Sequence, residues 1–150
     1  MINSKSILFL LLLAIFLTNS IASQTNNENW IPVRVEDQNK IYINESNLSC
    51  TQKDDIYVWV LEEFNKPIEL EGIDGKVYKT KTFYLMNNGM MRYSILQIIL
   101  FDEDKNVLKS YNYEHNSELT DFKYNTPILK DSNAEAVLNK CLEIVETKVD

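Results

Sequence analysis

Short runs of β-branched and aromatic residues, separated by turn residues, occupy the chain from residue 30 to residue 113. The strongest turn signal is Asn88-Gly89, because a tight primed hairpin turn needs positive φ and these two residues adopt it at little cost. Runs joined by such turns return beside one another as hairpins. We therefore predict an antiparallel meander sheet of about six strands, at residues 30–35, 40–43, 56–61, 76–86, 90–101 and 107–113.

The run from Tyr93 to Phe101 is mostly apolar on both of its alternating faces. We predict it to be the most buried strand, because both faces need cover to keep these side chains out of water. Residues Ser132 to Glu135 form a capping-box sequence, and an apolar stripe at helical spacing follows. The fold class is therefore α+β, with a C-terminal helix packed on one face of the sheet. Either loops and long side chains or a partner or second copy cover the other face. The stripe consists of Ala134, Val137, Leu138, Cys141, Ile144 and Val145.

The first 22 residues have the form of a secretory signal peptide. Lys5 precedes an unbroken apolar run from Ile7 to Leu17, and Ser20 to Ala22 places small residues where a signal peptidase reads them. A helix of this run is about 16 Å long, too short for a permanent membrane span. We therefore expect a protein that is secreted or periplasmic. The predicted divisions are a signal peptide at 1–22, a flexible leader at 23–29 and a single domain at 30–146.

The charge and the missing motifs exclude several function classes. The formal net charge is -7, which repels phosphate backbones and makes nucleic acid an unsuitable partner. The chain has neither a G-x-S-x-G elbow nor a glycine-rich phosphate loop, and its single histidine, His115, lacks a second base or metal ligand. We therefore expect no catalytic residues, no cofactor and no metal site, and we interpret the protein as non-enzymatic.

Two cysteines, Cys50 and Cys141, follow the signal sequence. An even pair of thiols in an exported protein is most simply a disulfide, which here closes a loop of about 90 residues. The alternative is two free buried thiols. A Cys50–Cys141 disulfide would attach the C-terminal helix to the sheet.

Four aromatic residues lie in or after the last predicted strand: Tyr111, Tyr113, Phe122 and Tyr124. Exposed aromatic side chains are well suited to gripping a protein surface, so we predict a partner-binding role for them. Packing in the core is the alternative explanation.

The order of several short motifs resembles that of the surface-adhesin protein E family of small exported bacterial domains. The motifs are Trp30-Ile31-Pro32-Val33, Lys40-Ile41-Tyr42-Ile43-Asn44, Val58-Trp59-Val60, Tyr93-Ser94-Ile95-Leu96, Phe101-Asp102, Val107-Leu108 and Thr126-Pro127-Ile128, followed by a helix ending near Cys141. The resemblance covers roughly residues 30 to 142. It implies an antiparallel sheet, a C-terminal helix tethered across it by a disulfide, and adhesin-like binding.

Two features of this chain depart from the family pattern. Family members usually carry the partner cysteine in the strand before the Tyr93 segment, where this chain has Met86 to Asn88, so Cys50 would have to substitute. Several members are also lipid-anchored, and this chain lacks the required cysteine. Both departures concern how the protein is tethered and leave the implied sheet-and-helix fold unchanged.

Two hypotheses from different functional classes follow. The first is an exported binding module that uses a sheet face or an aromatic strand to grip another protein, such as a host extracellular protein, or its own copy. The second is a periplasmic small-ligand or haem carrier, with a pocket between helix and sheet and His115 as a haem ligand.

Overall fold

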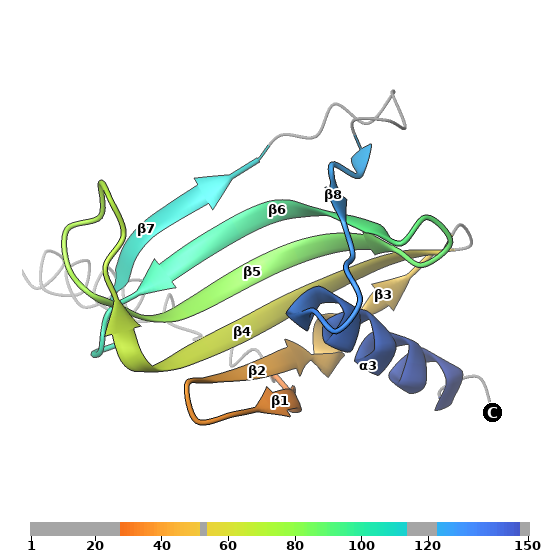
Figure 1. The fold of residues 1–150 in the computed structure, drawn as a ribbon, viewed down its shortest axis with the longest axis horizontal. Helices are drawn as coiled ribbons and strands as arrows, with labels where there is room; N and C mark the ends of the chain where they lie inside the picture. The colour runs from red at the N-terminus through yellow and green to blue at the C-terminus, as the bar shows by residue number, and fades with distance from the viewer. Residues whose placement is uncertain (1–27, 52–53, 114–122, 148–150) are drawn as a thin grey trace, which may run out of the picture.

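The structure, a computed structural model, describes residues 28–51, 54–113 and 123–147. These residues form one antiparallel sheet, a short 3-10 helix and an α-helix (Figure 1). The strands are β1 (Trp30–Val35), β2 (Asn39–Asn44), β3 (Ser49–Cys50), β4 (Asp55–Ile68), β5 (Val77–Asn87), β6 (Arg92–Phe101), β7 (Val107–Asn112) and β8 (Thr126–Pro127). The helices are η1 (Glu45–Asn47) and α3 (Asn133–Thr147).

The main sheet follows the order β1-β2-β4-β5-β6-β7, and each neighbouring pair is antiparallel. Two further strands, β3 and β8, pair with β4 and β6. The predicted α+β architecture, a meander sheet with a C-terminal helix, is confirmed. The described residues contain eight strands rather than about six, because β3 and β8 have only two residues each. Runs of that length leave no periodic signal in a sequence.

The helix α3 begins as the capping sequence predicts, with a small change in geometry. The hydroxyl oxygen of Ser132 accepts a hydrogen bond from the N–H of Glu135 at 3.2 Å. The Glu135 carboxylate accepts one from the N–H of Asp131 at 2.7 Å, rather than from the cap residue itself. The apolar side of α3 then packs on the sheet. The core consists chiefly of Ile41, Ile43, Ile56, Val58, Val60, Met86, Ile128, Val137, Leu138, Cys141 and Ile144.

The prediction that β6 is the most buried strand is wrong. Only Ser94 and Leu100 are buried in β6, whereas the first half of β4 holds the buried residues Asp55, Ile56, Val58 and Val60. The reason is the position of the helix, since α3 contacts β1 and β4 (Figure 1). The apolar composition of β6 therefore does not indicate how buried this strand is.

The turn between β5 and β6 also differs from the prediction. Neither Asn88 nor Gly89 has positive φ, so the turn is not of the primed type. The N–H of Met91 donates to the carbonyl oxygen of Asn88 at 3.3 Å, and Met91 itself has φ of 50°. The left-handed residue therefore comes two positions after the glycine, on a methionine.

Both cysteines are free in the structure, so it does not contain the predicted Cys50–Cys141 disulfide. Cys141 is fully buried in the core between α3 and the sheet, whereas Cys50 is exposed on β3. The Sγ of Cys50 lies 3.6 Å from the carbonyl oxygen of Thr51. The Cys141 thiol is therefore shielded from water, whereas the Cys50 thiol is in contact with it.

The predicted signal peptide and most of the leader, residues 1–27, lie outside the described residues, and no described helix has the length and apolarity to cross a membrane.

Candidate functional site

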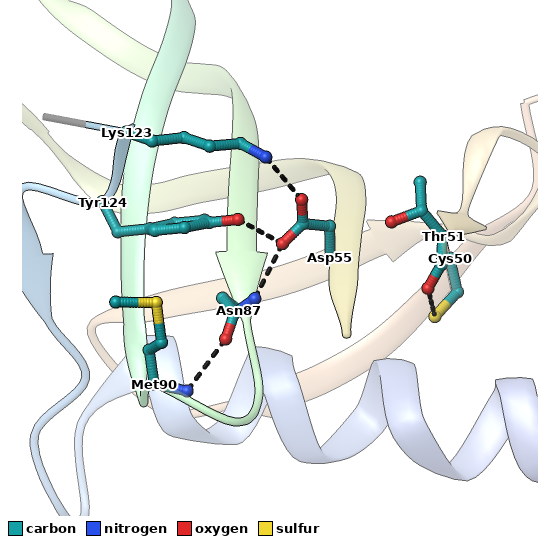
Figure 2. Close-up of polar contacts among 7 residues, drawn as sticks. All are labelled: Cys50, Thr51, Asp55, Asn87, Met90, Lys123 and Tyr124. Atoms are coloured by element: carbon teal, nitrogen blue, oxygen red, sulfur yellow. Dashed lines mark hydrogen bonds and ion pairs between the residues drawn. The ribbon is translucent and has the colours of Figure 1, made fainter. Parts of the chain in front are cut away.

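A buried carboxylate, Asp55, binds three side chains from two other parts of the fold (Figure 2). Lys123 Nζ lies 2.6 Å from Asp55 Oδ2, and the Tyr124 hydroxyl donates to Oδ1. Asn87 Nδ2 donates to the same Oδ1 at 2.7 Å. The Asn87 side-chain oxygen in turn accepts from the N–H of Met90 at 2.8 Å. We call Asp55, Asn87, Lys123 and Tyr124 the Asp55 network.

The electrostatics of the Asp55 network favour the charged pair. Burial has the largest effect on the pKa of Asp55 and raises it, but hydrogen bonds from Lys123, Tyr124 and Asn87 together outweigh burial and leave this pKa below its ordinary value. The hydrogen bond to Asp55 raises the pKa of Lys123. Burial, followed by the hydrogen bond to Asp55, raises the pKa of Tyr124. At neutral pH the network therefore consists of a carboxylate, an ammonium group and a neutral phenol.

This arrangement fastens the chain. All three donors point at one carboxylate, which stays ionised and hydrogen-bonded and is thus a poor general base. The network joins the start of β4 to the end of β5 and to the segment that leads into β8. Arg92 supports the same segment through the carbonyl oxygens of Tyr124 and Asn125, at 2.7 and 3.1 Å. Sequence reasoning missed Asp55, Asn87 and Lys123, because no local pattern pairs residues so far apart in the chain.

The structure separates the four predicted partner-binding aromatics. Tyr111 and Tyr113 are exposed, at 37% and 48%. Tyr124 is 4% exposed and belongs to the Asp55 network, so the prediction that it grips a partner is wrong. Its hydroxyl finds a buried carboxylate, which makes the interior the favourable place for the ring. Phe122 lies outside the described residues.

Tyr111 and Tyr113 belong to an edge of the sheet. Among the described residues, β7 pairs only with β6, and Figure 1 shows it at the border of the sheet away from β1 and α3. All residues of β7 except Leu108 are exposed. Lys109 to Asn112 pair regularly with Leu100 to Gln97, and Tyr113 continues that ladder by donating its N–H to Leu96 O at 2.9 Å. We call the side of Lys109–Tyr113 that faces away from β6 the β7 edge.

A second group of aromatic side chains lies on the sheet face opposite the core. Trp59 and Phe83 are paired across β4 and β5, and their rings stack with centroids 4.9 Å apart. Lys81 Nζ lies 5.2 Å from the Trp59 ring centroid and 5.4 Å from that of Trp30. Glu28 accepts a hydrogen bond from the Trp30 indole and pairs with Lys81. Apart from the exposed Glu28, these side chains are half-buried and contact one another, whereas Tyr111 and Tyr113 are exposed.

One small cavity lies between described residues of the helix and the sheet. A cavity there, lined by Ile41, Tyr84, Ala134, Val137 and neighbouring side chains, measures about 40 Å³. Pockets for drug-sized ligands are about 300–1,000 Å³, so a haem does not fit in this space. A larger depression of about 730 Å³ lies beside the turn between β1 and β2, but it opens to solvent at the far end of β4. His115 lies outside the described residues.

No family model matches the chain, and neither a curated protein nor a solved structure matches it. The resemblance to the surface-adhesin protein E family therefore stays a prediction. The functional argument has to come from the geometry of the described residues.

Proposed function

We propose that this protein is an exported, non-catalytic binding module that takes up an extended segment of a protein partner as an extra strand along the β7 edge. The observation that carries the proposal is an edge strand that, within the described part of the chain, pairs on one side only and exposes two aromatic rings, Tyr111 and Tyr113. Edge strands offer unpaired backbone groups to other chains, and many recognition domains bind peptides in this way.

The two edge strands of the sheet, β1 and β7, differ in how accessible they are to a partner strand. At the β1 edge, Pro32 has no N–H to donate, and the register with β2 shifts between Pro32 and Arg34. Arg34 Nη1 also donates to Asn133 Oδ1 of α3 at 2.8 Å, which places the helix beside this edge. The β7 edge contains no proline, and no described residue of a helix forms a contact of this kind with it. The contrast supports β7 as the edge at which a partner binds.

The direction of the backbone groups on β7 follows from its pairing with β6. The N–H of Tyr113 points at β6, and backbone groups along an antiparallel strand alternate in direction. Ser110 and Asn112 therefore direct their N–H and C=O groups away from β6. An added strand would take its hydrogen bonds from these two residues, and the side chains of Tyr111 and Tyr113 would lie against it.

Export and the type of partner complete the proposal. The apolar run from Ile7 to Leu17 supports secretion or a periplasmic location, and the resemblance to surface adhesins supports a protein as the ligand. A host extracellular protein fits both. The haem-carrier alternative has less support, because the cavity that described residues of α3 and the sheet line is about 40 Å³.

Binding to immobilised extracellular-matrix and plasma proteins, measured by biolayer interferometry, tests the proposal. Ser110→Pro removes the outward N–H at the centre of the β7 edge and keeps the backbone bonds to β6, but it also removes the hydroxyl that accepts a hydrogen bond from Gln97 Nε2 of β6 at 3.4 Å. Ser110→Thr keeps the N–H and is the matched control. We expect this protein to bind at least one of the immobilised proteins. The affinity of that binding should fall at least tenfold in Ser110→Pro and change little in Ser110→Thr. The absence of binding, or equal binding by a folded Ser110→Pro variant, would overturn the proposal.

A further inference from the structure

The charge on the β7 edge specifies the partner further, on the assumption that the proposed function holds. Lys109 is the single charged residue of β7. Within the described residues Lys109 makes no ion pair, whereas Lys79 and Lys81 of β5 are paired with Glu63 and Glu28. Its ammonium group lies 6.0 Å from the centroid of the Tyr111 ring. As far as the described residues go, the edge therefore presents one positive charge without an ion pair, next to an aromatic ring.

Strand geometry defines which side chains of a partner would meet these two. In an antiparallel addition, Ser110 would form a hydrogen-bonded pair, so Lys109 and Tyr111 would form non-hydrogen-bonded pairs. Side chains are closest at such pairs, about 4.5 Å between Cα atoms. Because side chains alternate along a strand, Lys109, Tyr111 and Tyr113 lie on one face of the sheet, and the partner side chains opposite them would lie on that same face. These three positions therefore select the sequence that binds.

We infer that the β7 edge binds an extended segment of another protein that carries an acidic side chain opposite Lys109 and aromatic or β-branched side chains opposite Tyr111 and Tyr113. Opposite charges and aromatic or β-branched pairs are the favourable cross-strand combinations. In antiparallel order the partner segment has the two apolar residues first and the acidic residue last, each separated by one position.

A second copy of this chain fits the edge less well. Pairing two β7 strands about Ser110 would place Tyr111 of one copy opposite Lys109 of the other, which leaves both ammonium groups without an acid. Each chain also carries a formal net charge of -7, so two copies repel each other. The net charge also repels an acidic segment, but salt screens that repulsion beyond a Debye length of about 8 Å. The carboxylate beside Lys109 would lie within this distance, where the attraction to the ammonium group is screened less.

Three capped synthetic heptapeptides test the inference: TVTYTET, TVTYTQT and TVTYTKT. Their sixth residue lies opposite Lys109, and their fourth and second residues lie opposite Tyr111 and Tyr113. Titration into the isotope-labelled protein, produced from the full chain, is followed by the amide NMR signals of Ser110 and Asn112. We expect TVTYTET to bind about three- to fivefold more tightly than TVTYTKT, with the neutral peptide between them.

Two variants separate this inference from the proposed function. Lys109→Glu should reverse the order of the peptides, and Ser110→Pro should abolish the binding of all three. Binding that is lost in Ser110→Pro but indifferent to charge would overturn the acidic specificity and leave the proposed function intact. No binding, or binding insensitive to Ser110→Pro, would overturn both. Light scattering could also detect a dimer of the wild-type protein. If Ser110→Pro is then a monomer, the β7 edge binds a second copy, and the inference is overturned.

Discussion

Tyr124 donates its phenolic hydrogen to the carboxylate of Asp55, 69 residues earlier in the chain (Figure 2). The bond ties the segment that leads into β8 and α3 to the first residue of β4. Met90 joins the same contact through Asn87, so the turn between β5 and β6 is held by it as well. One buried carboxylate therefore orders three separate stretches of backbone at one end of the sheet.

Replacing the carboxylate should destabilise the whole domain. In Asp55→Asn the side chain keeps its shape but loses its charge, and Lys123 loses its acidic partner. Hydrogen bonds to charged groups contribute about 1.5–3 kcal/mol each, and Lys123 is partly exposed, so we expect the free energy of unfolding to fall by about 2 kcal/mol. Urea unfolding followed by circular dichroism measures it.

The neighbouring residue supplies the control for that substitution. Asp54 has φ of 61°, a conformation that asparagine tolerates well, so Asp54→Asn should leave the unfolding midpoint nearly unchanged. Equal effects of the two substitutions would show that the Asp55 network contributes nothing special to stability.

The network should also give the protein a specific dependence on acid. Because the folded-state pKa of Asp55 is lowered, its stabilising effect is complete above the unfolded-state value of about 3.9 and is lost as the pH falls through the folded-state value. The difference in unfolding free energy between the wild type and Asp55→Asn should therefore be largest near neutral pH and vanish at the acid end. A difference that stays constant between pH 7 and pH 2 would contradict this.

The sheet could be predicted because its signals are local. The run of residues at 30–35 coincides with β1, and the predicted strand at 107–113 differs from β7 by one residue. The limits of β4 could not be predicted in the same way. It extends to Ile68, through charged residues and past Pro67, because pairing with β5 resumes at Ile68 after a shift in register. Tertiary pairing there outweighs local preference.

The candidate sites show a similar division. The exposure of Tyr111 and Tyr113 agrees with one of the two explanations that the sequence left open, a surface position rather than packing in the core. Tyr124 lies close to these residues in the sequence, yet its ring is buried and its hydroxyl donates to the Asp55 carboxylate, which comes from another part of the chain. Which strand α3 covers, and hence which strand is most buried, is also a long-range property that periodicity does not contain.

The turn between β5 and β6 carries a residue in an unfavourable conformation. Met91 has φ of 50°, which costs a side-chain-bearing residue about 1–2 kcal/mol relative to glycine. We therefore expect Met91→Gly to stabilise the protein by about 1 kcal/mol, despite the greater freedom of glycine in the unfolded chain. Thermal unfolding measures the gain.

Its neighbour makes the comparison informative. Met90 is also exposed but is not among the residues with positive φ, so Met90→Gly should lower the stability by a few tenths of a kcal/mol, roughly the entropic cost of glycine. The same sign for both substitutions would refute the role given to the Met91 conformation.

The two cysteines should differ sharply in reactivity. Burial raises the pKa of the Cys141 thiol to about 12, and the side chain has no exposed surface. Cys50 is exposed on β3. Because the thiolate is the reactive form, iodoacetamide at pH 8 should modify Cys50 in the folded protein and reach Cys141 only after unfolding in urea. Peptide mass spectrometry reads both sites. Should neither cysteine react in urea until a reductant is added, the sulfurs are joined, and the disulfide predicted from the sequence holds instead of the free thiols of the structure.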